Sequence, residues 1–159
     1  SYMNRSAPFP TSHPELSARI YRLINDLYVL LDAADRKVLS RFGLSVSQYR
    51  LMILLSDYEG HHLTTLSDHL LCARSTVTRL IDQLEANGLV ARSHDEEDRR
   101  AQFVCLTGKG KVVWEAVAVE HAAALEYALT GLSEPERSQL LVLFEKTRLG
   151  LMRSAEPSL

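Results

Sequence analysis

The hydrophobic pattern in the middle of the chain changes from a helical period to an extended one, and this change limits the possible folds most strongly. Residues 75–86 carry four aliphatic side chains that fall on one side of a helix at about 100° per residue: Val77, Leu80, Ile81 and Leu84. Asn87-Gly88 follows as a C-terminal stop. Two short apolar runs, 89–92 and 103–107, then enclose a charged stretch. This pattern predicts a helix followed by a β-hairpin with a charged tip.

Two shorter helices are expected before that one. Residues 45–48 offer an N-terminal cap for the first, and its apolar face ends before Glu59-Gly60. Residues 61–63 are expected to form a short extended connector, after which a second helix opens at 65–68 and stops near Leu71. Two short helices, a tight turn, a third helix and a hairpin together predict a winged helix-turn-helix, in a mainly α fold with one small β-wing.

Long amphipathic stretches flank this middle lobe. They predict a helix over 12–40, another over 109–129 and a last one that runs to about 151. Capping boxes open the first and the last of these helices: Ser12 with Glu15, and Ser133 with Glu136. The first helix is longer than one small core requires, so part of its apolar stripe is expected to pack on another surface. A single bundle within one chain and pairing across a dimer both satisfy this pattern.

The outer face of the helix over 75–86 carries groups that suit DNA. Four side chains lie roughly opposite the aliphatic side, with Thr76 at the edge: Ser75, Thr78, Arg79 and Asp82. Hydroxyl groups and backbone amides at a helix start suit phosphate, and an arginine can pair bidentately with guanine in the major groove. Asp82 could accept from cytosine or simply face solvent. Polar outer faces are common on amphipathic helices, so DNA binding also needs evidence from the hairpin.

The tip of the hairpin ends in Arg99 and Arg100, and an arginine at a wing tip can enter the narrow, negative minor groove. The charge balance opposes this interpretation. Residues 74–100 contain five arginines and six acidic residues, and the chain has a net charge of −2 and a pI near 6.3. A specific DNA binder needs only a basic contact face. A winged helix that binds protein instead of DNA fits the acidic pI better, and salt-dependent binding to duplex DNA separates the two.

Two segments carry a family resemblance. Residues 66–70 and 74–92 contain the second short helix and the helix, stop and strand that follow it. Asp98-Arg99-Arg100 is followed by Val104-Cys105-Leu106-Thr107-Gly108-Lys109-Gly110. A recognition helix, an Asp-x-Arg wing and a Leu-Thr-x-x-Gly motif at this spacing resemble the core of the MarR family of transcriptional regulators. The likeness is dense over 44–110, and the long terminal helices agree with the family in layout.

The resemblance implies a sequence-specific regulator, expected to be a repressor, that binds a pseudo-palindromic operator in double-stranded DNA as a homodimer. Five residues would meet the major groove: Arg74, Ser75, Thr76, Thr78 and Arg79. Arg100, beside Arg99, would enter the minor groove and be oriented by Asp98. Ala73 stands where the family often has a capping serine, so Ser75 is expected to cap the helix instead.

The resemblance also assigns the domains. Residues 12–40 and 109–152 would form a helical dimerisation region and 45–108 the DNA-binding lobe, with flexible ends at 1–11 and 153–159. A ligand cleft would lie between the dimerisation region and the lobe. Apolar residues near that junction suggest an aromatic or amphipathic small molecule that alters the affinity for DNA: Leu16, Ile20, Leu23 and Trp114.

Metal, redox and enzymatic functions have weaker support. Four histidines fall in the middle lobe, but no two of them have i,i+4 helical spacing: His61, His62, His69 and His94. The peroxide-sensing branch of the family keeps its reactive cysteine in the first helix, where this chain has none, so Cys72 and Cys105 are expected to be packing residues. A metal- or redox-responsive regulator of the same fold stays an alternative. No glycine-rich phosphate loop or Ser-His-Asp pattern is present, so neither catalysis nor a cofactor is expected.

The expected compartment is the cytoplasm. No apolar run approaches the roughly 18 residues that a membrane span needs, and the N-terminal segment lacks the basic-then-apolar layout of a signal peptide. Two cysteines without any mark of a secretory route favour a reduced compartment.

Overall fold

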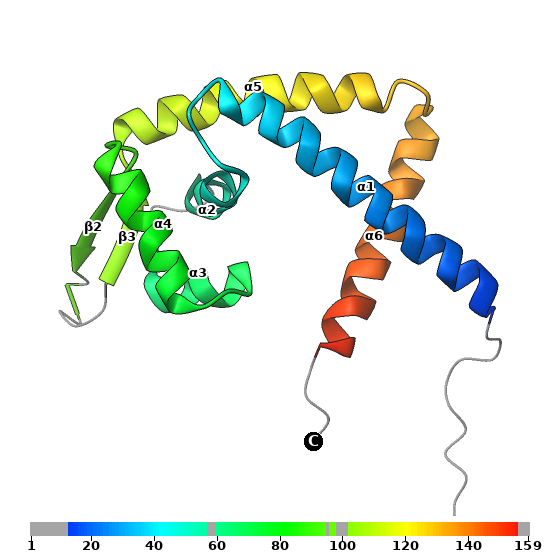
Figure 1. Ribbon diagram of the computed structural model, residues 1–159, viewed down its shortest axis with the longest axis horizontal. Coiled ribbons are helices and arrows are strands. Elements are labelled where there is room, and N and C mark those ends of the chain that lie inside the picture. Colours follow the sequence, from blue (N-terminus) through cyan, green and yellow to red (C-terminus); the bar gives the residue numbers. More distant parts are fainter. Residues whose placement is uncertain (1–12, 57–59, 95, 98–101, 156–159) are drawn as a thin grey trace, which may run out of the picture. The chain divides into compact units, whose positions relative to one another are not determined.

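The computed structural model describes residues 13–56, 60–94, 96–97 and 102–155. These residues form six helices and three strands in the order α1 (Pro14–Ser40), α2 (Val46–Ser56), β1 (His61–His62), α3 (Leu63–Leu70), α4 (Arg74–Ala86), β2 (Val90–His94), β3 (Gln102–Leu106), α5 (Gly108–Ala128) and α6 (Glu134–Ser154) (Figure 1). The mainly α fold with a small β-wing is therefore confirmed. Among the described helices, none combines the length and apolarity that a membrane span requires.

The sheet has three antiparallel strands in the order β1-β3-β2. β2 and β3 form the expected hairpin, in which His94 pairs with Gln102. β1 was expected only as a connector, but it adds a third strand because His62 pairs with Phe103. Gly60, directly before β1, has a φ of 151°, and a Cβ there would overlap the ring of Phe103. Only glycine permits both that backbone conformation and that close approach.

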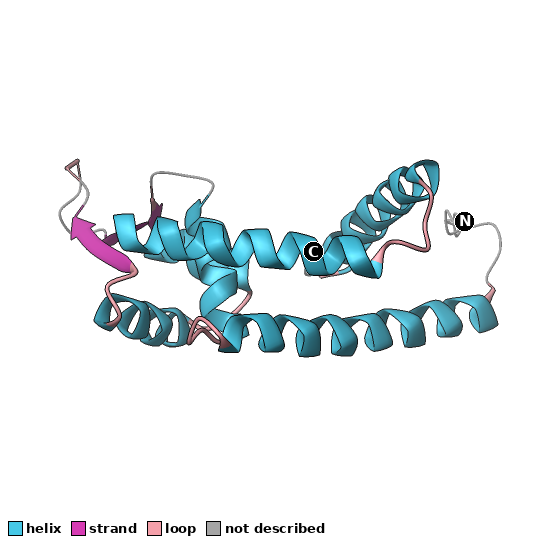
Figure 2. Ribbon diagram, turned by 90° about the horizontal axis from the view of Figure 1, so that it is seen from above, coloured by secondary structure: helices cyan, strands magenta, loops and turns pink. Residues whose placement is uncertain are grey.

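The chain divides into two compact units, residues 1–114 and 115–159. In the first unit α2 is central, because it packs against α1, α3, α4 and β3. The strands, magenta in Figure 2, lie at one edge of this unit beside its helices. The side chains at its core are at most 1% exposed: Leu39, Leu51, Met52, Leu55, Leu66, Val77, Ile81, Leu84 and Val104. No polar or charged residue in the described ranges is buried, so apolar packing holds this unit together.

Two helix starts differ from the expectation. α1 begins at Pro14 with His13 as its N-cap, so the expected cap at Ser12 is wrong by one residue; Ser12 itself lies outside the described residues. Proline is favoured at the first helical position because its φ is already helical and its missing N–H has no helical partner to lose. α3 begins at Leu63, earlier than predicted, because Leu63 is part of the buried core at 7% exposure.

Two other helix starts have the reciprocal capping bonds that their sequences indicate. The backbone N–H of Gln48 donates to Ser45 Oγ at 3.1 Å, and that of Ser45 donates to Gln48 Oε1 at 3.0 Å. At α6 the N–H of Ser133 donates to Glu136 Oε2 at 2.7 Å, and the N–H of Glu136 donates to Ser133 Oγ at 3.3 Å. Each pair satisfies N–H groups that a first helical turn leaves without an intrahelical partner.

In the second unit, Arg137 ties the start of α6 to the end of α5. Its guanidinium donates to the carbonyl of Leu129 at 2.8 Å and pairs with Glu126 at 2.8 Å. α6 has no buried residue along its length. Leu140 is half-buried, and seven other large apolar side chains are 48% to 63% exposed: Leu141, Val142, Leu143, Phe144, Leu149, Leu151 and Met152. The unit alone therefore leaves most of the apolar surface of this helix uncovered.

Candidate nucleic-acid interface

α4 has one buried face and one exposed face. The four aliphatic side chains assigned to the inner face from their spacing are 0% to 4% exposed: Val77, Leu80, Ile81 and Leu84. They anchor the helix on the core that α2 and α3 share with it. Because burial fixes the rotation of the helix about its axis, the opposite side chains are turned outward.

Polar contacts also hold the C-terminal half of α4. Gln48 Nε2, on α2, donates to Gln83 Oε1 at 3.0 Å. At the helix end, the N–H of Leu89 donates to the carbonyl of Leu84 at 2.9 Å, and Gly88 adopts a left-handed φ of 72°. This is the glycine stop that the sequence predicts. α4 is therefore a fixed support for its exposed side chains.

The outer face of α4 brings together the five residues expected to meet the major groove. Arg74, Ser75 and Arg79 are exposed, whereas Thr76 and Thr78 are half-buried. The Thr78 hydroxyl donates to the carbonyl of Arg74 at 3.0 Å, so its oxygen remains an acceptor for another donor. In the part of the chain that the structure describes, neither the Arg74 nor the Arg79 guanidinium forms an ion pair or hydrogen bond. Both cations are therefore available for phosphate or for base edges.

Ser75 does not cap α4, contrary to the expectation. The N-cap is Ala73, with φ −62° and ψ 145°, and no side chain accepts from the first turn. The carbonyl of Ala73 accepts from the N–H of Thr76 at 3.0 Å and of Val77 at 3.2 Å. The extended backbone of Ala73 thus starts the helix at Arg74, and Ser75 lies inside the first turn with its side chain on the exposed face.

Asp82 faces an arginine. Arg92, on β2, places Nη2 2.5 Å from Asp82 Oδ1 and Nη1 2.9 Å from Glu85 Oε1. Burial alone would lower the pKa of Arg92, but the hydrogen bonds and charges of the two carboxylates outweigh it and raise that pKa above its ordinary value. Asp82 therefore shares its negative charge with Arg92, although its side chain remains 60% exposed.

The wing supplies the second part of the expected interface. Asp98, Arg99 and Arg100 lie outside the described residues. Described residues of the wing line a hollow of about 460 Å³: Ser93, His94, Glu96, Glu97 and Phe103. Two glutamates are among its described lining residues. A minor-groove contact by the wing therefore stays a prediction that rests on Arg99 and Arg100.

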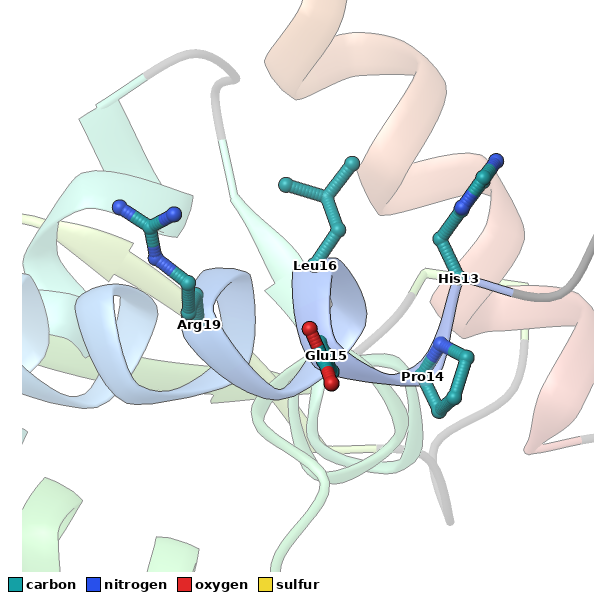
Figure 3. A pocket seen from close by; sticks show the side chains of 5 residues that line it. All are labelled: His13, Pro14, Glu15, Leu16 and Arg19. Carbon is teal, nitrogen blue, oxygen red and sulfur yellow. The ribbon is translucent and has the colours of Figure 1, made fainter.

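The residues assigned to a small ligand differ in their surroundings. Leu16 lines a hollow of about 410 Å³, whose described lining comes from the start of α1 (Figure 3): His13, Pro14, Glu15, Leu16 and Arg19. Ile20 and Leu23 lie farther along the helix and are 49% and 59% exposed. Trp114 is half-buried, and its Nε1 has no hydrogen-bond partner within the described ranges. The hollow includes only Leu16 of the four, and its charged lining differs from that expected around an aromatic ligand.

The cysteines and one histidine of the lobe have structural contacts. Cys105 Sγ donates to the carbonyl of Ala91 at 3.8 Å across the hairpin, and Cys72 is half-buried in the turn before α4. The ring of His62 meets that of Phe103 edge-on, with centroids 5.5 Å apart. Across the described ranges, no group of three or more His, Cys, Asp or Glu side chains is placed to hold a metal ion.

Sequence patterns did not single out Gln48 or Arg92 as supports of α4. Their partners Gln83 and Glu85 lie 35 and 7 residues away on another element, so no helical or strand period connects them. Arg92 stands within the segment that resembles the MarR family, and this was its only signal in the sequence. The contacts depend on how α2 and β2 pack on α4, which the sequence pattern does not state.

Comparisons with known proteins agree with this geometry. The family model described as MarR family matches residues 44–102. The HTH-type transcriptional regulator YkoM of Bacillus subtilis is 28% identical over 138 residues, which cover 87% of this chain and 90% of YkoM. The HTH-type transcriptional repressor YetL of the same organism is 28% identical over 140 residues, covering 82% and 84%. A solved MarR-family transcriptional regulator from Silicibacter pomeroyi is 30% identical with a TM-score of 0.67, covering 79% of this chain and 84% of that one.

Proposed function

This chain belongs to the MarR family of DNA-binding transcriptional regulators, and from that premise we propose that it is a homodimeric repressor of a pseudo-palindromic operator. The observation that carries the proposal is the outer face of α4. Arg74, Ser75 and Arg79 are exposed there, and both guanidinium groups are unpaired among the described residues. The helix is fixed beneath them by its buried aliphatic side. Such a helix can enter the major groove of B-DNA.

The proposed contacts divide by role. Arg79 reads a base edge, while Arg74, Ser75, Thr76 and Thr78 contact the backbone or the neighbouring bases. From the wing, Arg100 and Arg99 reach the minor groove, with Asp98 orienting Arg100. Repression is proposed because YetL, which aligns over most of this chain, is named a repressor. A regulator of this kind works beside its DNA, in the cytoplasm.

The proposed dimer is supported by apolar surface. Tyr21, Leu23 and Leu30 of α1 are 59% to 69% exposed, and seven apolar side chains of α6 are 48% to 63% exposed. Patches of this kind on terminal helices mark surfaces that pair with another chain. We therefore assign 12–40 and 109–152 to dimerisation and 45–108 to DNA. Sedimentation at micromolar concentration should give a dimer, whereas a monomer would contradict the proposal, since two half-sites could not be read together.

A small aromatic ligand is proposed as the effector, through Leu16, Ile20, Leu23 and Trp114. Leu16, Ile20 and Leu23 are exposed apolar side chains, and Trp114 has an indole N–H without a partner in the described ranges. A ligand changes operator affinity only through its different affinity for the DNA-competent and incompetent conformations. Aromatic acids and phenols should be screened by thermal shift, and hits tested for release of DNA. Hits that stabilise the protein without changing its DNA affinity would exclude the switch and leave DNA binding intact.

Selection from genomic fragments tests the main proposal. The purified protein should enrich duplexes that share a two-fold motif with half-sites about one helical turn apart. Binding to them should weaken steeply with salt, because phosphate contacts release counterions. Failure to enrich any duplex at low salt would refute operator binding. It would favour the protein-binding winged helix, which the acidic pI near 6.3 also suits.

A further inference from the structure

One arginine joins the wing to the recognition helix. Arg92 is on β2, where it pairs with the buried Val104 of β3. Its guanidinium reaches two carboxylates of α4, with Nη1 at 2.9 Å from Glu85 Oε1 and Nη2 at 2.5 Å from Asp82 Oδ1. Its backbone N–H also donates to Glu85 Oε2 at 3.2 Å. Glu85 therefore holds both the main chain and the side chain of Arg92.

These bonds fix more than a side chain. Arg92 lies midway along β2, and the strand continues through Ser93 and His94 toward the charged tip. Because Glu85 bonds the strand backbone directly, a change in this bond changes the angle at which the hairpin leaves α4. A guanidinium that bridges two carboxylates has a narrow range of geometries, unlike a single ammonium group.

The same bonds control charge on the outer side of α4. The side chains of Asp82 and Glu85 are 60% and 43% exposed, and two free carboxylates there would repel the phosphates of DNA. Arg92, whose side chain is only 22% exposed, neutralises one of these charges and keeps both carboxylates turned toward β2. Arg79 and Arg74 differ from Arg92, because their guanidinium groups have no partner within the described residues.

We propose that Arg92 is a positioning residue for DNA binding: through Glu85 and Asp82 it sets the wing against the recognition helix, and it does not itself contact DNA. The proposal rests on the proposed function, in which α4 and the wing enter neighbouring grooves. In this role for Arg92, the carboxylates of Asp82 and Glu85 are required for tight binding to DNA, even though both carry negative charge close to the phosphates.

The competing role for Arg92 is a direct phosphate contact, and the two roles predict opposite signs for Glu85→Gln. Removing a negative charge near DNA should tighten binding on electrostatic grounds alone. If Arg92 positions the wing, Glu85→Gln should weaken binding to the selected duplex by about threefold to tenfold, because the amide cannot accept both bonds. Unchanged or tighter binding by Glu85→Gln would overturn the proposal.

A lysine substitution at Arg92 gives a second test between positioning and direct phosphate contact. Arg92→Lys keeps the charge but cannot bridge the two carboxylates, so it should bind nearly as weakly as Arg92→Ala. A phosphate contact would instead be largely kept by lysine, and wild-type affinity of Arg92→Lys would refute positioning. Arg41→Ala is the charge-matched control, since Arg41 is exposed and lies between the segments assigned to dimerisation and to DNA binding. It should leave operator affinity unchanged.

Footprinting shows which groove of the DNA loses its contact with the protein in each variant. The full-length variants are compared on the duplex that the wild-type protein selects, with thermal melting to verify folding. Arg92→Ala and Glu85→Gln should lose hydroxyl-radical protection of the minor groove beside each half-site, while guanine N7 protection in the major groove remains. Uniform loss of both signals would overturn the proposal. If Arg92→Ala does not fold, Glu85→Gln decides alone.

The wild-type protein distinguishes failure of the proposed function from failure of the proposal for Arg92. If the wild-type protein binds no duplex, the proposed function is refuted. If it binds and the variants give unchanged footprints, only the role of Arg92 is refuted.

Discussion

The hydroxyl of Thr107 donates a hydrogen bond of 2.6 Å to the carbonyl of Gly88, and this bond joins the start of α5 to the turn that ends α4. The same oxygen accepts from the backbone N–H of Gly110 at 3.0 Å. The backbone N–H of Thr107 donates to the carbonyl of Leu89, also at 3.0 Å. The Leu-Thr-x-x-Gly motif therefore has a structural role, which is to fasten the end of the recognition helix to the next helix.

Thr107→Val should destabilise the protein by roughly 1–3 kcal/mol, because it removes the donor to Gly88 and leaves the part-buried N–H of Gly110 without its acceptor. The measurement is the free energy of unfolding in urea. Thr130→Val is the control, since its hydroxyl makes only an exposed local bond to the carbonyl of Tyr127. Equal costs for the two variants would show that Thr107 has no special role.

Gly110→Ala should destabilise by about 1–3 kcal/mol or more, because the new Cβ would overlap the carbonyl oxygen of Leu89. Gly108→Ala is the matched control on the same helix, where a Cβ meets nothing within 4 Å. It should be neutral or slightly stabilising, since alanine is the better helix former. Chemical denaturation of both variants tests the contrast. If the stability of Gly110→Ala equals that of the wild type, the start of α5 packs less closely on Leu89 than it does in the structure.

Leu71→Gly should raise the free energy of unfolding by about 0.5–1 kcal/mol. Leu71 has a φ of 50° and is the one non-glycine residue with positive φ in the described ranges; its side chain is 92% exposed, so it contributes little burial. The left-handed conformation costs leucine about 1–2 kcal/mol, more than the entropy that glycine loses on folding. Gly43→Ala, at a φ of 67° with open space around it, should have the opposite sign. A destabilised Leu71→Gly would indicate that a partner covers Leu71.

The sequence predicts the elements of the lobe better than the contacts between them. All four inner residues of α4 and the glycine stop at Gly88 were identified correctly, because both signals are local. β1 was not identified as a strand, because a strand of two residues exists only through its pairing with Phe103 and Val104. The Arg92 contacts were missed for the same reason, since they depend on how β2 lies against α4.

Alkaline pH should lower the free energy of unfolding because Tyr49 ionises. Burial, and then the negative charge of Asp35, raise the pKa of Tyr49 from its ordinary value of 10.0. As the pH rises above that value, the unfolded chain ionises first, so stability is full below it and falls as the pH approaches the higher folded-state pKa. Tyr49→Phe should lose less stability than wild type over this range in urea titrations. Tyr127→Phe, at a position 81% exposed, should follow wild type. Parallel curves for wild type and Tyr49→Phe would contradict the assignment.

Arg79→Ala tests whether the outer face of α4 reads sequence. If the free guanidinium of Arg79 pairs with a guanine, its removal should cost roughly 1–3 kcal/mol on the selected operator and little on unrelated DNA, so sequence preference relaxes. Arg74→Ala, at the first residue of the helix, should instead weaken binding to both duplexes and make the salt dependence less steep. Affinities on the two duplexes at several salt concentrations distinguish these results. An equal loss on both duplexes for Arg79→Ala would make Arg79 a phosphate contact, and base reading would then have to come from Ser75, Thr76 or Thr78, the neighbouring polar residues of the same helix.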